Sequence, residues 1–134
     1  MPERAQRGML DTCVLIDLAS ITSELLPREP VVSAISLAEL AAGVQHAKDP
    51  VQRSLRVTTL LMAEANLDPV PFEEGAARIY ANLNALVLAA GRNPKPWRFD
   101  LLIAATAVAA GIPLYTRNVD DFKGLESQLT VVPV

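Results

Sequence analysis

The chain has 134 residues and a formal net charge of −3, which fits one ordinary domain and excludes the broadly basic surface typical of many nucleic-acid-binding proteins. Hydrophobic residues make up 51% of the sequence and aromatic residues only 4%, so we expect an aliphatic core of the kind found in parallel sheets covered by helices. So much apolar surface in a small domain is usually covered in part by a second copy or another partner.

Features that would place the protein in a particular compartment are sparse. The single cysteine, Cys13, excludes an intramolecular disulfide, and its apolar neighbours favour a buried structural residue. Residues 1–8 lack the apolar stretch of a signal peptide, and the uncharged run 101–116 is too short and too interrupted for a membrane span. We therefore expect a cytoplasmic protein with no membrane segment.

The N-terminal half predicts two strands and three helices after a loose tail at residues 1–7. A short apolar run ends at Asp11, and a helical segment follows it. Ser36 precedes apolar residues at helical spacing, and Asp49-Pro50 is typical of a helix start. The expected elements are a strand from 8 that ends at Asp11, a helix at 12–19, a strand at 31–35, a helix from 36, and a helix from 50 to about 65.

The C-terminal half adds two helices and three short strands. Two prolines indicate an edge strand at 67–72, Gly91 and Gly111 are typical of residues that end helices, and the apolar segment 100–110 predicts a central buried helix. The other expected elements are a helix at 73–90, a strand at 113–115, a polar loop at 118–124, and a strand at 129–132. Strands separated by helices predict one α/β domain over residues 1–134, with a mainly parallel sheet of four or five short strands.

Carboxylates follow several of the apolar runs, at the places where strands should end or helices begin. They are Asp11, Glu39, Asp100 and the pair Asp120-Asp121. Because the carboxyl ends of parallel strands meet at one edge of a sheet, we expect these side chains to converge there. Close carboxylates repel each other by roughly 4 kcal/mol per pair at an effective dielectric constant near 20, so the convergence indicates a site for a divalent cation.

Each carboxylate also has a purely structural interpretation. Asp11 and Asp100 stand where helix N-caps are found. Ser36 and Glu39 have the spacing of a capping box, in which the glutamate bonds back to the start of its helix. The acidic pair 120–121 is typical of a turn. These roles are compatible with metal binding, because helix N-termini favour negative groups.

The donor types restrict the metal. Carboxylate oxygens favour a hard cation, Mg²⁺ or Mn²⁺, and the chain has one His and one Cys, with no zinc-ligand spacing. His46 is expected to be a solvated side chain. Sequence motifs for nucleotide-binding loops and for hydrolase nucleophiles are missing from the chain.

Four segments together resemble the VapC-type toxins among the PIN-domain ribonucleases. The segments, in chain order, are residues 9–17 (MLDTCVLID), 33–40 (SAISLAEL), 99–107 (FDLLIAATA) and 114–122 (LYTRNVDDF). The resemblance covers nearly the whole chain from Gly8. It implies a PIN-like α/β/α sandwich and an Mg²⁺- or Mn²⁺-dependent endoribonuclease that hydrolyses RNA phosphodiester bonds. It also implies a homodimer and neutralisation by a VapB-like antitoxin.

The resemblance carries Asp11, Glu39 and Asp100 over as members of the acidic site. For the fourth member, Asp121 is favoured, while Asn118 and Asp120 stay open; Asn118 is then expected to shape the site. Asp11 and Asp100 are the expected direct metal ligands.

Further residues have expected supporting roles. Glu39 would be a ligand or would activate the attacking water, and the hydroxyls of Thr12 and Ser36 would orient carboxylates. Arg117 could contact phosphate, and Trp97 could stack on an unpaired base.

Two other functions compete with RNA cleavage. A non-catalytic PIN-fold module would use the same fold and its apolar surface only to bind a protein partner. A metal-dependent phosphatase would use a similar acidic site on small phosphomonoesters. The full set of four acids argues against the non-catalytic module, and substrate assays separate the other two functions.

Overall fold

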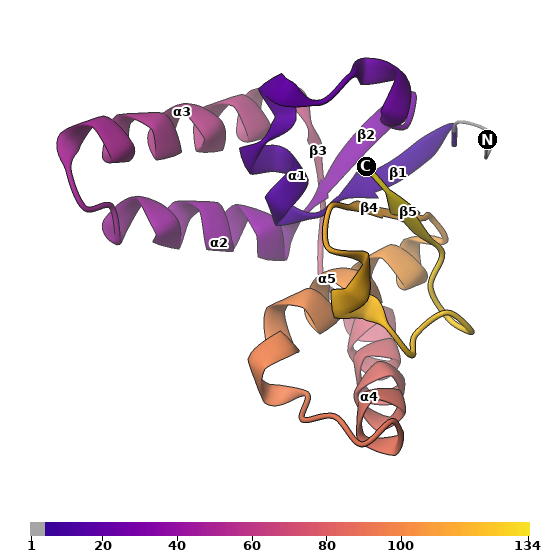
Figure 1. Ribbon diagram of the computed structural model, residues 1–134. Coiled ribbons are helices and arrows are strands. Elements are labelled where there is room, and N and C mark those ends of the chain that lie inside the picture. Colours follow the sequence, from indigo (N-terminus) through magenta and orange to yellow (C-terminus); the bar gives the residue numbers. More distant parts are fainter. Residues whose placement is uncertain (1–4) are drawn as a thin grey trace.

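A five-stranded sheet forms the centre of the computed structural model, which describes residues 5–134 (Figure 1). The strands are β1 (Arg7–Leu10), β2 (Glu29–Ser33), β3 (Asp68–Val70), β4 (Leu114–Thr116) and β5 (Val131–Pro133). Their order is β3-β2-β1-β4-β5, and every pairing is parallel. The carboxyl ends of all five strands therefore lie at the same edge, as expected from the sequence.

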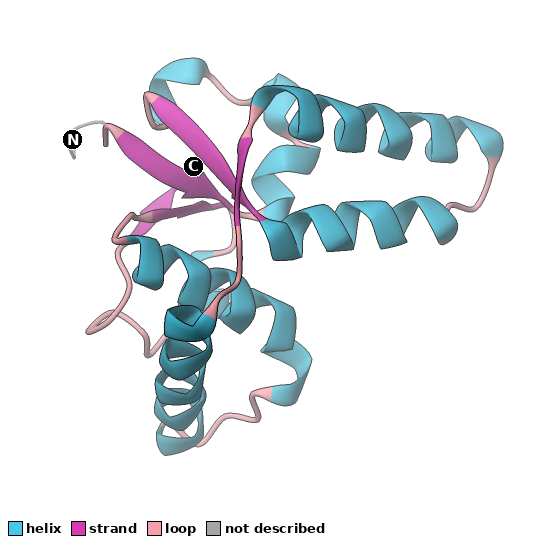
Figure 2. Ribbon diagram, turned by 180° about the vertical axis from the view of Figure 1, so that it is seen from behind, coloured by secondary structure: helices cyan, strands magenta, loops and turns pink. Residues whose placement is uncertain are grey.

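Helices cover both faces of this sheet. They are α1 (Thr12–Ile16), α2 (Ala34–Gln45), α3 (Pro50–Asn66), α4 (Glu74–Ala89) and α5 (Arg98–Ala110). The α2–α3 hairpin extends away from the sheet on one side, and α4 with α5 lies on the other (Figures 1 and 2). The expected α/β/α sandwich is confirmed.

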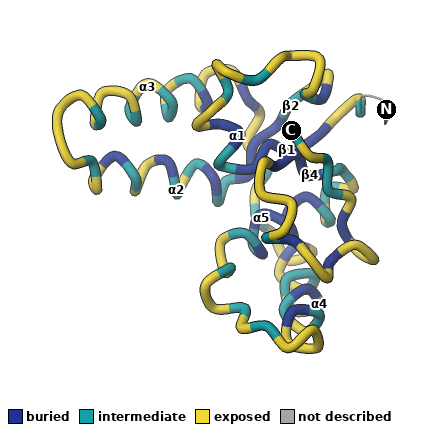
Figure 3. Tube along the Cα trace, in the orientation of Figure 1, coloured by how far each residue is buried: buried dark blue, intermediate teal, exposed yellow. Residues whose placement is uncertain are grey.

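Two separate cores result from the alternation of side chains along the central strands. Neighbouring residues of a strand point to opposite faces, so each strand supplies both cores. Met9, Val31 and Leu114 pack with residues of α4 and α5, whereas Leu10, Val32 and Tyr115 pack with residues of α1, α2 and α3. The buried parts of the trace run through β1, β2, β4 and α5 (Figure 3).

Several large apolar side chains stay outside both cores. The exposed set is Ile16, Leu25, Val51, Leu55, Leu61, Leu88, Phe99 and Val119. Within residues 5–134, no helix has the length and apolarity needed to cross a membrane.

The second strand and helix begin earlier than the sequence predicts. β2 pairs with β1 through residues 29–32 and with β3 through residues 31–33, so it ends at Ser33. The Ser33 side chain accepts the N–H of Ile35 (3.0 Å) as the N-cap of α2. The capping box of Ser36 and Glu39 is therefore wrong: Ser36 is buried inside α2, and Glu39 lies one turn beyond it.

Other element boundaries also differ from expectation. β1 already includes Arg7, so the loose tail expected at residues 1–7 is too long; residues 1–4 lie outside the described part. α1 ends at Ile16 and is followed by a 3₁₀ turn. β3 is an edge strand as expected, although it has only three residues. Gly91 and Gly111 have φ of 75° and 70°, which confirms both as residues that end helices.

We expect Gly8→Ala to lower the free energy of unfolding by about 1–3 kcal/mol through overpacking. A Cβ at Gly8 would stand 2.6 Å from Tyr115 Cε1 and 3.0 Å from Pro27 Cβ. Tyr115 is buried, so its ring has little room to move. Gly43→Ala in α2 is the matched control, because a Cβ there meets nothing within 4 Å. Urea denaturation measures both variants, and equal midpoints would contradict the close packing.

Candidate active site

Asp11 is held at the centre of the carboxyl edge, directly after β1. Its backbone N–H donates to the Tyr115 carbonyl (2.9 Å), and its side chain is only 4% exposed. Oδ1 accepts the N–H of Thr12 (2.9 Å), which confirms the N-cap role, and Oδ2 accepts the hydroxyl of Thr116 (2.8 Å). A buried carboxylate is costly unless it is hydrogen-bonded in this way.

The direction of the Thr116 hydrogen bond follows from its other partner. The backbone N–H of Asn118 donates to Thr116 Oγ1 (3.0 Å), so the hydroxyl proton is directed to Asp11. Thr116 is fully buried at the end of β4. The sequence analysis did not single out this residue, although a hydroxyl at the end of an apolar strand, two residues before Asn118, was a usable signal.

Cys13 also lies against Asp11. Its Sγ is 3.5 Å from Asp11 Oδ2 and 3.6 Å from Thr116 Oγ1. Burial raises the pKa of the thiol, and the charge of Asp11 adds to this. A protonated thiol is a poor nucleophile, so the position agrees with the expected structural role, although Cys13 is only half-buried.

Glu39 is joined to the same region by two hydroxyl side chains. Thr12 Oγ1 lies 2.8 Å from Glu39 Oε1 and 2.9 Å from Ser36 Oγ. Burial raises the pKa of Glu39, the contact with Thr12 opposes this, and the charge of Asp11 adds to it. Thr12 thus restrains the carboxylate of Glu39, and Ser36 contacts the Thr12 hydroxyl.

Asp100 lies in the first turn of α5, whose N-cap is Trp97 and has no side-chain capping bond. The N-cap position expected for Asp100 is therefore wrong. Burial raises the pKa of Asp100 to about 7, with further contributions from Asp11, Asp121 and Glu39. Like charges from three other segments of the chain thus act on this one carboxyl group, so the four acids are coupled electrostatically.

Among the three candidates for the fourth acid, Asp121 is the one that the fold brings to this cluster. Burial raises the pKa of Asp121, Asp11 adds to the increase, and Arg92 opposes it. Asp120 and the side chain of Asn118 are exposed. Asn118 instead contributes its backbone N–H, which fixes Thr116.

The acidic cluster, Asp11, Glu39, Asp100 and Asp121, fits a hydrated hard cation. All of its donors are oxygens, and their mutual repulsion would be relieved by positive charge. Within residues 5–134, no three His, Cys, Asp or Glu side chains are placed as a ready-made metal cage. Mg²⁺ keeps several waters and is commonly held by one or two carboxylates together with substrate phosphates, so it does not require three ligands from the protein.

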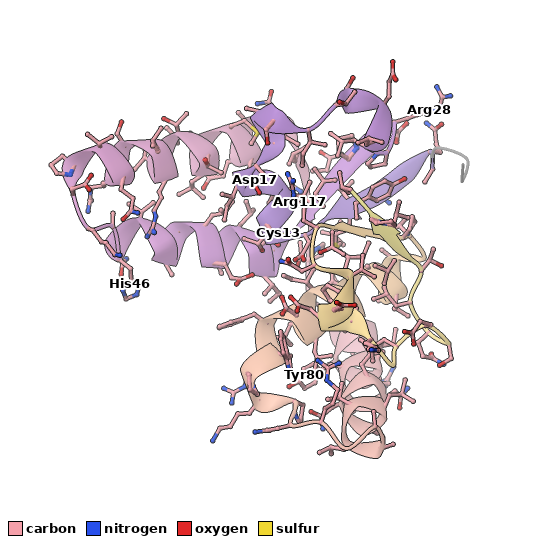
Figure 4. All side chains as sticks on the ribbon, viewed as in Figure 1. Cys13, Asp17, Arg28, His46, Tyr80 and Arg117 are labelled. Carbon is pink, nitrogen blue, oxygen red and sulfur yellow. The ribbon has the colours of Figure 1, made fainter. Side chains whose placement is uncertain are left out.

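Of the two residues expected to contact substrate, Arg117 lines an open pocket, whereas Trp97 packs against the core. Arg117 lies beside Asp17, with 3.7 Å between Nη1 and Oδ2 (Figure 4), and residues 117–121 line an open pocket of about 400 Å³. Trp97 packs against the α4–α5 core, and the guanidinium of Arg92 lies 5.2 Å from the centre of its ring. The sequence analysis missed Arg92, which no local pattern marks.

We expect the stability of the metal-free protein to fall as pH rises from about 4 to about 7. Asp100 has its pKa raised to about 7, so the folded chain binds a proton that the unfolded chain releases. Near pH 7.5, Asp100→Asn should be more stable than wild type by on the order of 2 kcal/mol, a value discounted for partial solvent exposure.

Urea denaturation in the presence of a chelator, at about pH 4.5 and pH 7.5, measures this effect. Glu64→Gln removes one negative charge from an exposed site on α3 and is the matched control. Added Mg²⁺ should stabilise wild type at the higher pH and leave Asp100→Asn little changed. If the stability of wild type and of Asp100→Asn depended on pH in the same way, that result would contradict the burial of Asp100 and its repulsion by the other acids.

A comparison with protein families identifies the fold family of the chain. The family model described as the PIN domain matches residues 8–126. Ribonuclease VapC5 of Mycobacterium tuberculosis is 33% identical over 127 residues, which cover 92% of this chain and 91% of the relative. Ribonuclease VapC of Rickettsia bellii is 32% identical over 108 residues, which cover 77% and 76% of the two chains.

Solved structures agree with this relationship. A chain of VapBC-5 from Mycobacterium tuberculosis, a member of the VapBC toxin–antitoxin family, superimposes with a TM-score of 0.84 at 32% identity, covering 96% of this chain and 99% of that one. A chain of VapBC2 from Rickettsia felis, solved with a DNA fragment from its promoter, gives 0.77 at 27% identity, covering 96% and 98%. This chain therefore belongs to the PIN-domain family, among the VapC ribonuclease toxins of VapBC toxin–antitoxin systems.

Proposed function

We propose that this protein is an Mg²⁺- or Mn²⁺-dependent endoribonuclease toxin that hydrolyses RNA phosphodiester bonds at the acidic cluster. The proposal is carried by the hydrogen bonds that join Asp11 through Thr12 to Glu39, and it is supported by the electrostatic coupling of Asp100 and Asp121 to Asp11. Asp11 follows β1, Glu39 lies on α2, Asp100 begins α5, and Asp121 follows β4. Oxygen donors that repel one another at the carboxyl edge of a sheet suit a hard cation and the phosphate that it binds.

Asp11 and Asp100 are proposed to hold the cation. Bound there, a divalent ion supplies charge neutralisation at the scissile phosphate and a more acidic water. Asp11 is fixed for this role by Thr12, which donates to Oδ1, and by Thr116 and the Cys13 thiol, which both donate to Oδ2. Oδ1 therefore keeps a free lone pair for the cation. Asp121 adds negative charge beside Asp100.

Glu39 is proposed to receive the proton of the attacking water. A general base needs a raised pKa and a fixed orientation, and burial raises the pKa of Glu39 while Thr12 holds its Oε1. Ser36 lies beside Thr12 and completes this short chain of hydroxyls. Arg117 is proposed to contact phosphate, and Asn118 to shape the site through Thr116.

RNA cleavage by the purified chain should require Mg²⁺ or Mn²⁺ and stop when a chelator is added. Asp11→Asn and Asp100→Asn should each lower the cleavage rate by at least about a hundredfold, because each removes a ligand charge. Asp121→Asn should also lower it, whereas Asp120→Asn, which removes the same charge from the exposed neighbour, should stay near wild type.

Gel analysis of a labelled RNA measures these rates. Cleavage that persists in the chelator, or in Asp11→Asn, would contradict the proposal. Hydrolysis of a small phosphomonoester without RNA cleavage would select the phosphatase instead.

We further propose that this chain forms a homodimer and binds a VapB-like antitoxin. The similar VapBC chains were solved as members of toxin–antitoxin pairs. In this chain, α3 exposes three large apolar side chains, Val51, Leu55 and Leu61, at 71%, 65% and 58% of their surfaces. Val51 and Leu55 lie one turn apart and share a face of α3, and a contiguous exposed apolar patch is typical of a protein–protein interface. The unneutralised acidic cluster also suits a basic side chain of the antitoxin.

The antitoxin should inhibit cleavage and bind less tightly when the acidic cluster loses charge. Asp121→Asn should weaken binding several-fold, because one carboxylate that attracts the basic side chain is removed. Asp120→Asn is the control with equal change in net charge. Calorimetric titration measures the affinity. A toxin–antitoxin complex that cleaves RNA at the full rate would contradict insertion of a basic group at the site.

A further inference from the structure

Arg92 is held in one position by a backbone hydrogen bond and by two contacts of its guanidinium group, one with a carbonyl oxygen and one with an aromatic ring. Its N–H donates to the Val87 carbonyl (3.1 Å), in the turn that ends α4. Nη1 donates to the Lys123 carbonyl (3.0 Å), and the guanidinium lies over the Trp97 ring at 5.2 Å from its centre. Trp97 is itself packed against the α4–α5 core. The guanidinium is thus positioned by packing before any ligand arrives.

The partners that fix this guanidinium are neutral. A carbonyl and an indole ring orient an arginine but do not cancel its charge. Within residues 5–134, the ion pairs within 4.0 Å are Arg78 with Glu74 and Arg117 with Asp17, so Arg92 has no carboxylate at that distance. Of the five N–H donors of a guanidinium, one is used by Lys123, which leaves donors for an anion.

The charge of Arg92 also reaches the acidic cluster. It opposes the burial and repulsion that raise the pKa of Asp121. Asp121 lies two residues before Lys123, so the loop that holds Arg92 is the same one that carries the fourth acid. Arg92 therefore lies beside the loop that carries Asp121, and its guanidinium has no carboxylate within 4.0 Å.

We propose that Arg92 is a substrate-positioning residue, whose guanidinium, fixed by Trp97 and the Lys123 carbonyl, binds a phosphate of the RNA strand next to the one being cleaved. The fork of an arginine matches two phosphate oxygens. Trp97 acts in this arrangement as the support for Arg92, in place of the base-stacking role expected from the sequence. The inference rests on RNA cleavage at the acidic cluster.

The first experiment measures RNA binding without cleavage. In the Asp100→Asn background and without metal, a fluorescent single-stranded RNA of about twelve nucleotides is titrated by anisotropy at several salt concentrations. Adding Arg92→Gln should weaken binding about tenfold and make the slope of log affinity against log salt shallower by about 0.7, the value for one lost contact with a single strand. Adding Arg92→Lys should restore the slope and only part of the affinity, because the charge remains without the fork.

Arg78→Gln, which removes the same charge from an exposed ion pair on α4, is the matched control and should change neither quantity. A residue that only ties two loops together would lower the melting temperature and leave the salt slope unchanged. That result would overturn the proposal, as would an Asp100→Asn parent that does not bind the RNA.

The second experiment uses the active chain. With metal present, Arg92→Gln should raise KM about tenfold and change kcat by less than about threefold, as expected for a contact made equally in the bound state and the transition state. Equal KM values in wild type and Arg92→Gln would overturn the proposal. Failure of wild type to cleave RNA, with the binding result intact, would instead reject the proposed metal-dependent cleavage and leave Arg92 as an RNA-binding residue.

Discussion

A carboxylate that is only 4% exposed needs partners inside the protein, and Asp11 takes one from the next residue and one from a distant part of the chain. The Thr12 N–H comes from the start of the helix that follows β1, and the Thr116 hydroxyl comes from the end of β4. The Thr116 hydroxyl is available only because β1 and β4 pair in parallel, with Leu10 opposite Tyr115. The sheet register therefore fixes the one carboxylate to which Glu39, Asp100 and Asp121 are all electrostatically coupled.

The size of the helix-dipole effect, compared with the pKa shift of Asp100, separates the structural interpretation of these acids from the functional one. A carboxylate in the first turn of a helix gains about 0.3–1 kcal/mol from the helix dipole. The pKa of Asp100 is nevertheless raised to about 7, so burial and repulsion outweigh that gain. Asp100 makes no capping bond, and the capping box at Glu39 does not form, because Ser33 is the N-cap. Only Asp11 combines a true cap with a place in the cluster.

The sequence was sufficient where local pattern decides the structure. Apolar runs followed by acids located β1 and β4, and the resemblance to VapC toxins located three of the acids. The end of β2 was not accessible, because it depends on pairing with β1 through Val32 and with β3 through Ser33, and Ser36 looks equally suitable as a cap. Arg92 was not accessible either. Its contact with Lys123 spans 31 residues and depends on how the turn after α4 packs beside the loop after β4.

The spacing of the acids has a consequence for how ion and substrate bind. Because residues 5–134 hold no closed cage of three ligands, a cation carried by one or two carboxylates would complete its coordination with waters and phosphate oxygens. Affinity for the ion and affinity for RNA would then be coupled, and each would raise the other. A guanidinium fixed beside the loop that carries Asp121 would strengthen this coupling, since it would attract the phosphate before the ion is fully coordinated. A basic group of an antitoxin would compete for the same negative potential, which would block both ligands with one contact.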